Sequence, residues 1–405
     1  MDSTIFDIEL THGLEFYEFN FEDKNKDILK DYTCINNNNI YIVSFSSKKY
    51  ITIELEGVKY TINKNFNYNI ITKITEPKLK IYNPYEFPSD CLFNFNISQY
   101  GNPSLSNTYE YNVVYSFDKN YYAGAFASIY SLVFNFKQDK IKKLMVNLML
   151  EKSDLDSFNI EFDKLRNSYD FNNKFSVYII DNMLLSDNIL TTKCFKGGNH
   201  LLKLANFARL LIGNLFNVDQ LLYLDSDTIV QSDLSKSFDK MRNKTYIIAG
   251  KKSELNFRNI LIAPNYDKAT ELLGETFDIN KSIIYTGTLF IKPKESRIIY
   301  SRMDKIVNCH NSLPNGLYKL FTMSITNLSL FDSMSYFDDY LVNVVDLGCK
   351  KINQNLLINA DVLDWSGIYK PWFKNGYYQD YWKKYNLLQY EKPEISTEKN
   401  TVETF

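Results

Sequence analysis

Hydrophobic and polar residues alternate with a period of two over most of the first eighty residues. The segments 40–45, 50–55 and 58–62 place apolar side chains at every second position, and Glu56 and Gly57 separate the last two. This pattern is typical of antiparallel strands that bury one face and are joined by short turns. It predicts a small β-sandwich-like or meander segment from residue 5 to about residue 82.

The pattern changes after residue 108. Apolar runs of strand length then alternate with segments of helical periodicity, and the clearest examples are 113–117, 123–136, 176–180, 201–215 and 221–225. Such alternation favours a mostly parallel sheet with helices on both faces. Proline, glycine, serine and asparagine between residues 83 and 107 predict a linker. We therefore divide the chain into a β-rich accessory domain with its linker (1–108), an α/β domain (109–388) and a polar C-terminal tail (389–405).

Composition and charge narrow the class of protein. A chain of 405 residues can bury a large core, and a formal net charge of −2 gives no indication of a nucleic-acid partner. The five cysteines are far apart, which argues against a zinc site and against a disulfide framework. We find neither a secretion signal nor an apolar run of the roughly 20 residues that cross a bilayer. The sequence therefore predicts a cytoplasmic protein.

The most informative motif is Asp225-Ser226-Asp227, which directly follows the apolar run 221–224. Ligands bind beyond the carboxyl ends of strands in open α/β sheets, so both aspartates fall where a ligand would bind. Side chains at positions i and i+2 of an extended segment point the same way, so the two carboxylates can bind one Mn²⁺ or Mg²⁺ ion. Such an ion can hold a diphosphate. A strand-end turn capped by aspartate is the alternative interpretation.

The surroundings of this motif resemble one known enzyme family. A helical pattern over 201–212 includes Arg209, a short loop leads into the strand before Asp225, and Asp233 follows the second aspartate. This order is similar to that of the retaining glycosyltransferases of family 8, which include bacterial lipopolysaccharide galactosyl- and glucosyltransferases. The resemblance extends over residues 111–385. It implies an α/β, Rossmann-like nucleotide-sugar transferase fold of the GT-A type, preceded here by a small all-β domain.

The resemblance assigns nucleotide-binding roles to residues after the first strand of the α/β domain. The segment 118–121 matches the family's opening turn, which implies that Asp118 and Asn120 bond the base or ribose and that Tyr121 stacks on uracil. A polar turn between a strand and a helix is equally compatible with these residue types. Arg209 and Ser226 would complete the contacts to the nucleotide sugar.

A second match lies near the C-terminus. Residues 364–372 resemble the family's His-x-x-Gly-x-x-Lys-Pro-Trp segment, with Asp364 at the histidine position. The resemblance implies that Asp364 is a third metal ligand and that Gly367 and Lys370 meet the diphosphate. Because carboxylate oxygens suit Mn²⁺ and Mg²⁺, the exchange of histidine for aspartate preserves metal binding in principle. It also leaves open a non-catalytic relative.

The segments that would contact the sugar match the family less well. Tyr285 stands where relatives carry an asparagine, and a pair of lysines stands near the position of an acidic residue. Asp338 keeps the first carboxylate of the family's Asp-Gln-Asp segment, and Asp339 replaces its glutamine. A carboxylate there can form a glycosyl ester or bond a sugar hydroxyl. We interpret Asp338, Asp339 and Lys370 as the candidate catalytic residues.

Together these features predict a metal-dependent retaining hexosyltransferase. It would move a hexose from a UDP-sugar to a glycan or lipid-linked glycan acceptor in bacterial surface polysaccharide or lipopolysaccharide synthesis. In this interpretation Asp225, Asp227 and Asp364 bind Mn²⁺ or Mg²⁺. The alternative is a non-catalytic sugar- or partner-binding protein on a degenerate transferase scaffold.

Aromatic residues and lysines are mixed over residues 369–385. Tryptophan and tyrosine favour the membrane interface and lysines favour anionic headgroups, so one hypothesis places this run at the inner face of the membrane. A C-terminal segment packed on the catalytic domain is the alternative. The sequence gives no indication of the oligomeric state.

Overall fold

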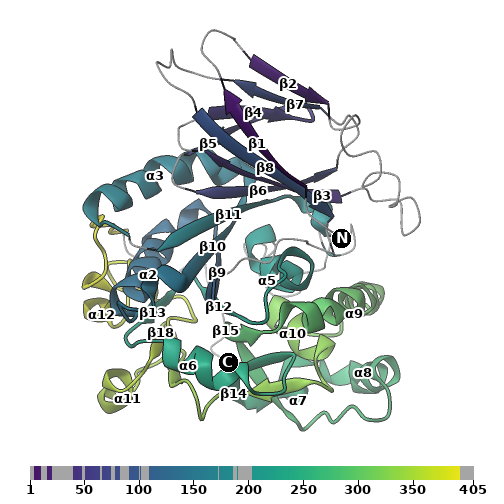
Figure 1. The fold of residues 1–405 in the computed structure, drawn as a ribbon. Coiled ribbons are helices and arrows are strands. Elements are labelled where there is room, and N and C mark those ends of the chain that lie inside the picture. The colour runs from purple at the N-terminus through teal and green to yellow at the C-terminus, as the bar shows by residue number, and fades with distance from the viewer. Residues whose placement is uncertain are drawn as a thin grey trace.

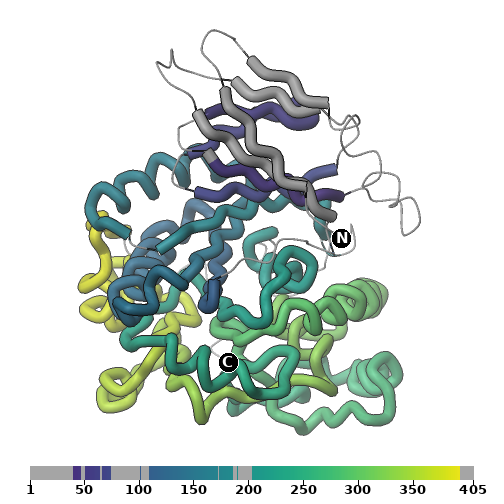
Figure 2. The backbone as a smooth tube through the Cα atoms, in the orientation of Figure 1, coloured from purple at the N-terminus to yellow at the C-terminus, as the bar shows by residue number. Residues whose placement is uncertain are grey.

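The computed structural model of the chain describes residues 4–10, 16–20, 40–47, 51–63, 66–73, 78–82, 91–99, 101, 109–171, 173–185, 189 and 203–392. An 11-stranded mixed sheet runs through its centre and helices cover the sheet on both faces (Figure 1). The backbone trace in Figure 2 follows the chain from the N-terminal strands, through this sheet, to a C-terminal segment packed against its helices. The fold is thus of the predicted α/β class.

Four parallel strands form the middle of the sheet. In spatial order they are β11 (Lys174–Ile180), β10 (Leu144–Glu151), β9 (Tyr111–Ser116) and β12 (Leu221–Asp225). Every residue of β9 is buried, as expected for a parallel strand covered on both faces. The predicted parallel arrangement is therefore confirmed for these strands.

Beyond β12 the sheet becomes mixed. There β15 (Ser282–Ile291) runs antiparallel to β12, and β14 (Ile248–Asn256) runs antiparallel to β15. The short β16 (Met334–Tyr336) pairs in parallel with β14 at the edge. The register between β14 and β15 shifts after Gly250 and Leu289, and the extra residues lie on β15, between Ile284 and Leu289.

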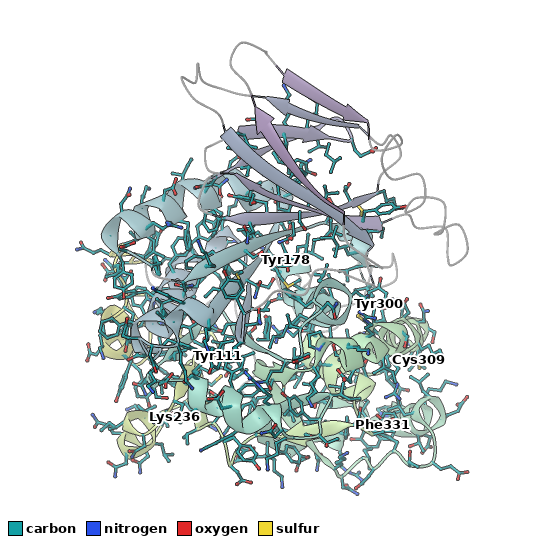
Figure 3. All side chains as sticks on the ribbon, in the orientation of Figure 1. Tyr111, Tyr178, Lys236, Tyr300, Cys309 and Phe331 are labelled. Carbon is teal, nitrogen blue, oxygen red and sulfur yellow. The ribbon has the colours of Figure 1, made fainter. Side chains whose placement is uncertain are left out.

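Side chains of the central strands alternate between two hydrophobic cores, one on each face of the sheet. In β9, Val113 and Tyr115 join the first core and Val114 joins the second. The first core includes α2 (Tyr122–Asn135) and α3 (Leu155–Ser168). The second includes α5 (Leu204–Leu215), α9 (Pro293–Ser312) and α10 (Phe321–Ser329). On this second face the rings of Tyr178, labelled in Figure 3, and Phe216 lie 4.5 Å apart.

Shorter strands and helices surround the central sheet. A three-stranded sheet contains β13 (Thr228–Val230), β18 (Val362–Asp364) and β17 (Asn343–Val344) in that order. The remaining short helices include η1 (Lys119–Tyr121), α6 (Ser235–Arg242), α7 (Phe257–Ile260), α8 (Tyr266–Leu273), α11 (Gln354–Ile358) and α12 (Gln379–Lys383).

The predicted N-terminal β strands are present, and half of them extend the central sheet. β6 (Asn67–Lys73) pairs in parallel with β11, and β3 (Ile40–Ser47), β8 (Cys91–Gln99) and β1 (Thr4–Leu10) follow as antiparallel neighbours. The boundary proposed near residue 108 marks a change in the type of element. The sheet itself continues across that boundary.

A second N-terminal sheet packs on this extension, as the sandwich-like alternative predicted. It contains β2 (Phe16–Asn20), β7 (Lys78–Tyr82), β4 (Ile51–Leu55) and β5 (Val58–Ile62). The hairpin from β4 to β5 turns at Glu56 and Gly57, whose φ values are 52° and 72°. Two positive φ values in a two-residue turn match the right-handed twist of a hairpin.

The N-terminal strands and the α/β part share one core. The ring of Phe66 lies 5.1 Å from that of Phe162 on α3, and the Tyr68 hydroxyl donates to Asn159 Oδ1 at 2.7 Å. The Asn63 side chain donates to Asp163 Oδ1 at 2.9 Å. These contacts join the segment before residue 108 to a helix of the α/β part.

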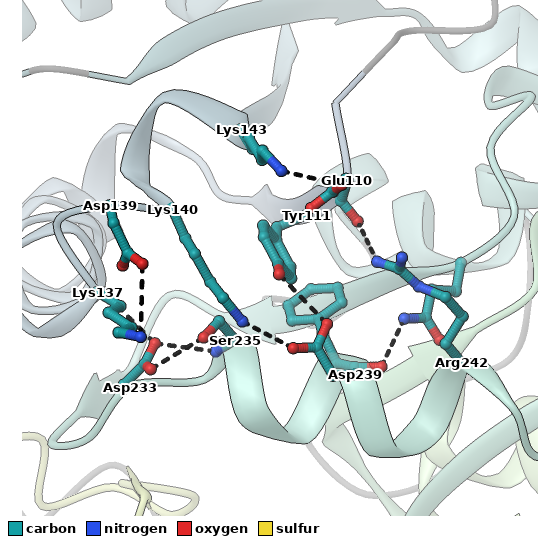
Figure 4. A network of polar contacts seen from close by, with 12 residues as sticks. Glu110, Tyr111, Lys137, Asp139, Lys140, Lys143, Asp233, Ser235, Asp239 and Arg242 are labelled. Carbon is teal, nitrogen blue, oxygen red and sulfur yellow. Dashed lines mark hydrogen bonds and ion pairs between the residues drawn. The ribbon is translucent and has the colours of Figure 1, made fainter.

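Charged residues at the amino end of β9 pair with one another, as Figure 4 shows. Asp239 on α6 accepts a hydrogen bond from Tyr111 and forms an ion pair with Lys140 at 2.7 Å. The Asp233 carboxylate accepts from both the amide and the hydroxyl of Ser235 at the start of α6. Asp233, part of the family resemblance, thus stabilises a helix start.

The aromatic run 369–385 packs on the domain. Trp372 and Trp382 are buried, and Trp382 Nε1 donates to the Ala123 carbonyl of α2. This arrangement is the packed alternative, and contact of this run with a membrane stays a prediction. Within the described residues no helix is both long and apolar enough to cross a membrane.

The first residues of the proposed tail are anchored. Tyr390 donates to Glu161 Oε2 on α3 at 2.6 Å, and the amide of Lys392 donates to the Trp372 carbonyl at 2.8 Å. The tail from residue 393 lies outside the described residues. Within the range 83–107 that was predicted as a linker, Cys91–Gln99 instead form β8, a strand paired on both sides in the central sheet, and most of the rest lies outside the described residues.

Candidate active site

The carboxyl ends of β9 and β12 lie side by side, because Ser116 pairs with Asp225 in the parallel register. The turn that begins at Asp118 is therefore next to the turn at Asp225-Ser226-Asp227. β18 brings Asp364 to the same edge through its antiparallel pairing with β13. The amide of Trp365 donates to the Asp227 carbonyl at 3.0 Å and fixes this arrangement. Three distant parts of the sequence thus meet where the motif predicted.

A cavity of about 300 Å³ lies beside Asp118. Its lining includes Asp118, Asn120, Glu151, Asp154, Asn182 and Lys203. Asp118 Oδ1 accepts a hydrogen bond from the amide of Asn120 at 2.7 Å, and Oδ2 forms an ion pair with Lys203. Burial, together with the charge of Asp154, raises the pKa of Glu151. The cavity therefore offers both acceptors and an ammonium donor to a polar ligand.

Tyr121 is close to both the turn at Asp118 and the aspartate motif, because the charges of Asp118, Asp225 and Asp227 all act on its phenol. Its ring meets that of Trp372 edge-on, with centroids 5.7 Å apart. Burial raises the pKa of Tyr121, while the nearby Lys370 ammonium lowers it. The ammonium of Lys392 donates to the Asn120 carbonyl, so the end of the described chain reaches the rim of the cavity. These contacts hold the turn that the sequence assigned to the nucleotide.

Asp225 is fixed from the side of α5. Its Oδ1 accepts hydrogen bonds from Arg209 Nη2 at 2.8 Å and from the Tyr223 hydroxyl at 2.7 Å. Arg209 Nη1 also donates a hydrogen bond, at 2.6 Å, and its acceptor is the Thr286 carbonyl. Burial raises the pKa of Asp225, and the Arg209 guanidinium opposes that shift. Arg209 itself is only 8% exposed, so within this site it acts through Asp225.

Gly287 on β15 lets two carboxylates approach the strand closely. A Cβ atom on Gly287 would lie 3.1 Å from Asp225 Oδ2 and closer still to Asp364 Oδ2. Asp364 is 4% exposed, and burial and the charges of Asp227 and Asp225 raise its pKa well above the usual range. Any side chain at Gly287 would therefore collide with the Asp364 carboxylate, and its absence lets the Asp225 and Asp364 oxygens meet at this position.

Asp227 has a different partner. Its Oδ2 forms an ion pair with the Lys370 ammonium, which also donates to the Trp365 carbonyl at 2.6 Å. Burial lowers the pKa of Lys370, but the Asp227 carboxylate outweighs that effect and the pKa is raised. Lys370 is thus held as a cation beside the aspartate motif.

Two further predicted residues shape the neighbouring backbone. Ser226 is buried, and its carbonyl oxygen packs against Gly124 near the start of α2. Gly367 has a φ of 106°, and a Cβ there would contact Cys349 Sγ and the Gly348 backbone. Only glycine fits this left-handed position, which lets the loop between Asp364 and Lys370 turn tightly.

The residues fit a divalent cation in part. Asp225 and Asp364 supply carboxylate oxygens that meet at Gly287. Carboxylate oxygens are the donors that Mn²⁺ and Mg²⁺ prefer. Within the described part of the chain, however, no group of three or more His, Cys, Asp or Glu side chains is arranged to hold a metal ion. A three-carboxylate shell would require Lys370 to release Asp227.

We expect Asp364→Asn to raise the thermal midpoint of the metal-free protein at pH 7.5, measured by calorimetry in a chelator. Because the folded-state pKa of Asp364 is raised, its favourable contribution is present below its unfolded pKa of about 4 and is lost as pH rises through the folded value. Each kcal/mol of relief corresponds to about 1 °C for a chain of this length. The gain should shrink near pH 5, and equal midpoints at both pH values would contradict a strained carboxylate.

The sequence profile described as "Glycosyl transferase family 8" matches residues 112–376, which is more than half of the chain. The chain belongs to glycosyltransferase family 8. The matched range begins in β9 and ends after Lys370. It therefore includes every residue of the candidate site named in this section except Lys392.

Solved glycosyltransferase structures are similar to this chain in fold. The apo structure of the WbbM bifunctional glycosyltransferase is 16% identical, with a TM-score of 0.50 over 78% of this chain. This chain spans about half of that protein, 54% of its length. The galactosyltransferase LgtC, solved with donor and acceptor sugar analogs, is 12% identical with a TM-score of 0.46 over 68% of this chain and 95% of its own. The fold is the predicted GT-A type.

Asp338 and Asp339, which the family resemblance assigns to the sugar, have other partners than the aspartates at Gly287. Asp338 is exposed; its Oδ2 accepts from the amide of Lys252 at 2.9 Å, and Oδ1 lies 3.7 Å from the Lys251 ammonium. Asp339 is exposed too, and its charge acts on Lys244. Neither has a recorded contact with the aspartates at Gly287 in the described structure.

The sequence analysis missed three residues that the structure brings to the site. Lys203 pairs with Asp118, Thr286 anchors Arg209, and Asp346 accepts a hydrogen bond from the Tyr285 hydroxyl at 3.3 Å. Lys203 lies in the first turn of the predicted helix of Arg209 and directly precedes α5 in the structure, so its proximity could have been inferred from helix placement. Asp346 follows an unremarkable apolar pair in the sequence, and no local signal marks it.

Proposed function

We propose that the protein is a metal-dependent retaining hexosyltransferase that uses a UDP-sugar donor. The observation that carries this proposal is the pair of carboxylates, Asp225 and Asp364, that meet at Gly287 near the Lys370 cation. Charge builds up on the diphosphate as the anomeric bond breaks, so cations fixed at this position favour the reaction.

In this proposal Asp225, Asp227 and Asp364 hold Mn²⁺ or Mg²⁺, and the metal, when bound, supplies Lewis-acid stabilisation of the departing UDP. Arg209 orients Asp225 and balances its charge. Lys370 adds a second positive charge for the diphosphate. Its present ion pair with Asp227 keeps that ammonium within reach of the same oxygens.

The cavity at Asp118 would receive the nucleoside. Asp118 and Asn120 would accept and donate hydrogen bonds to the base or ribose, and the ring of Tyr121 would stack on the base. Ser226 and Gly367 lie in the two turns that would surround the diphosphate. The charges of Asp118 and of Asp225 both act on Tyr121, which supports a nucleotide that extends from the cavity toward the aspartate motif.

Retention of the donor configuration and the roles of Asp338 and Asp339 remain part of the proposal. Either carboxylate would bond a sugar hydroxyl, and Asp339 is also of the residue type that forms glycosyl esters. The proposed acceptor is a glycan or lipid-linked glycan of a bacterial surface polysaccharide or lipopolysaccharide. Synthesis would take place in the cytoplasm, at the inner face of the membrane where such acceptors are present.

Hydrolysis of UDP-glucose and UDP-galactose by the full chain tests the proposed function. We expect UDP release from at least one donor in the presence of Mn²⁺ or Mg²⁺ and at least a tenfold slower release in a chelator, about 1.4 kcal/mol of barrier. Quantification of UDP by chromatography provides the measurement. Absence of both UDP binding and UDP release with either metal would favour the non-catalytic alternative.

A further inference from the structure

A second polar cluster lies close to Gly287 on β15. Tyr285 precedes Gly287 by two residues, in the stretch where the register between β14 and β15 shifts. Two extended residues span about 7 Å, so the backbone of Tyr285 lies at most that far from the backbone of Gly287. Thr286, between them, contacts Arg209 through its hydroxyl.

Asp346 contacts Tyr285 directly. The Tyr285 hydroxyl donates to Asp346 Oδ2 at 3.3 Å, and burial and the Asp346 charge raise the pKa of Tyr285 to about 12. The phenol therefore stays protonated at neutral pH and remains a donor. Both residues are partly exposed, and the side chain of Asp346 is 19% accessible. A ligand can consequently reach them from solvent.

One serine ties Asp346 to the carboxylate at Gly287. The amide of Asp346 donates to Ser366 Oγ at 3.0 Å, and that hydroxyl donates to Asp346 Oδ1 at 3.3 Å. The amide of Ser366 donates to Asp364 Oδ1 at 2.9 Å. Asp346 and Asp364 are therefore held by the same short loop, and their relative positions are fixed.

The backbone at Asp346 is also unusual. Its φ is 68°, in the left-handed region that non-glycine residues seldom adopt. The amides of Cys349 and Lys350 donate to its carbonyl at 2.9 and 3.1 Å, and Gly348 pairs with Gly367. This turn aims a carboxylate at Tyr285 at a cost in backbone energy that neighbouring contacts offset.

The carboxylate keeps capacity for a ligand. An ionised carboxylate has about four acceptor positions, and Ser366, Tyr285 and Lys350 use three of them. The side chain of Lys350 is 57% exposed, so its ion pair contributes little and a ligand hydroxyl can replace it. The group that fits here is an uncharged hydrogen-bond donor.

We propose that Tyr285 and Asp346 form the hydroxyl-binding wall of the donor-sugar pocket, with Asp346 accepting hydrogen bonds from the hexose of the UDP-sugar. This inference rests on the proposed function. A diphosphate bound at the carboxylates near Gly287 would place its hexose beside Asp346, because Ser366 bonds both Asp346 and Asp364. Asp346 then determines donor specificity, at a point where Tyr285 replaces the family's asparagine.

The test is calorimetric titration of the full chain with UDP, UDP-glucose and UDP-galactose in Mn²⁺. Asp346→Asn keeps the shape and the left-handed backbone and removes the charge; Asp346→Gly removes the side chain and relaxes the backbone. We expect both variants to bind UDP within about twofold of the parent protein. The tighter of the two UDP-hexoses should bind about tenfold more weakly, as loss of a hydrogen bond to a charged group predicts.

Two further variants sharpen the result. Tyr285→Phe removes the hydroxyl that donates to Asp346 and should weaken UDP-hexose binding less than Asp346→Asn does. Asp267→Asn, at an exposed aspartate on α8, is the matched control and should leave all three affinities unchanged.

The outcomes separate this inference from the proposed function. Parental UDP-hexose affinity in both Asp346 variants would overturn the inference, and so would an equal loss of UDP and UDP-hexose affinity, because that would indicate a structural role. Failure of the parent protein itself to bind UDP would overturn the proposed function, and this inference with it.

Discussion

Asp225→Asn is expected to weaken Mn²⁺-supported UDP binding at least about 100-fold, or about 2.7 kcal/mol. The substitution removes one of the two carboxylates that face Gly287, and an amide oxygen is a much weaker ligand for a hard cation. It also leaves the buried Arg209 guanidinium without its counter-charge, so stability should fall by up to about 3 kcal/mol. Calorimetric titration of UDP with Mn²⁺ and with a chelator measures the first effect, and urea unfolding measures the second.

A matched control separates metal binding from the loss of an ion pair. Asp332 forms hydrogen bonds of 2.8 and 2.9 Å with Arg302, far in sequence from the aspartate motif. Asp332→Asn should therefore lose an Arg–Asp pair and still bind UDP like the parent protein. If Asp225→Asn keeps parental affinity for UDP in Mn²⁺, Asp225 is not a metal ligand.

Phe66→Ala is expected to lower the free energy of unfolding by about 3–5 kcal/mol, the usual cost of removing a buried phenylalanine ring. Phe66 is 3% exposed and its ring contacts those of Phe158, Phe162 and Phe175 at centroid distances of 5.8, 5.1 and 6.0 Å. These three partners belong to α3 and β11, so the cavity would form between the N-terminal strands and the α/β part. Urea unfolding followed by circular dichroism provides the measurement.

The control for this variant is Phe134→Ala. Phe134 is 47% exposed and its ring also contacts aromatic neighbours, so its loss should cost less than about 1 kcal/mol. Equal and small effects of the two substitutions would show that the segment before residue 108 adds nothing to the stability of the α/β part. In that case the segment would be a separate accessory unit despite the shared sheet.

Charge balance explains why the site tolerates three carboxylates at one edge of the sheet. Arg209 offsets Asp225 and Lys370 offsets Asp227, each through a direct ion pair, whereas the hydrogen bond described for Asp364 comes from the amide of Ser366. Burial and the charges of Asp227 and Asp225 raise the pKa of Asp364 well above its usual range. A cation that binds at Gly287 would relieve this residue most.

The sequence by itself determined the local elements and the position of the motif. Continuous apolar runs such as 221–224 fixed buried parallel strands, because a strand covered on both faces needs apolar side chains at every position. Two aspartates after such a run necessarily lie at the carboxyl end of the strand. The period-two pattern fixed the hairpin at Glu56 and Gly57 for the same reason.

Only the tertiary structure decided which partners these elements take. The pairing of β6 with β11 could not be inferred from either segment, because backbone hydrogen bonds carry no sequence signature and the two strands are about a hundred residues apart. The same holds for the side-chain partners in the site: the pairing of Lys370 with Asp227, and the approach of Asp346 to Tyr285 through a left-handed turn. These contacts depend on packing between distant segments, and a local pattern of hydrophobic and polar residues does not encode it.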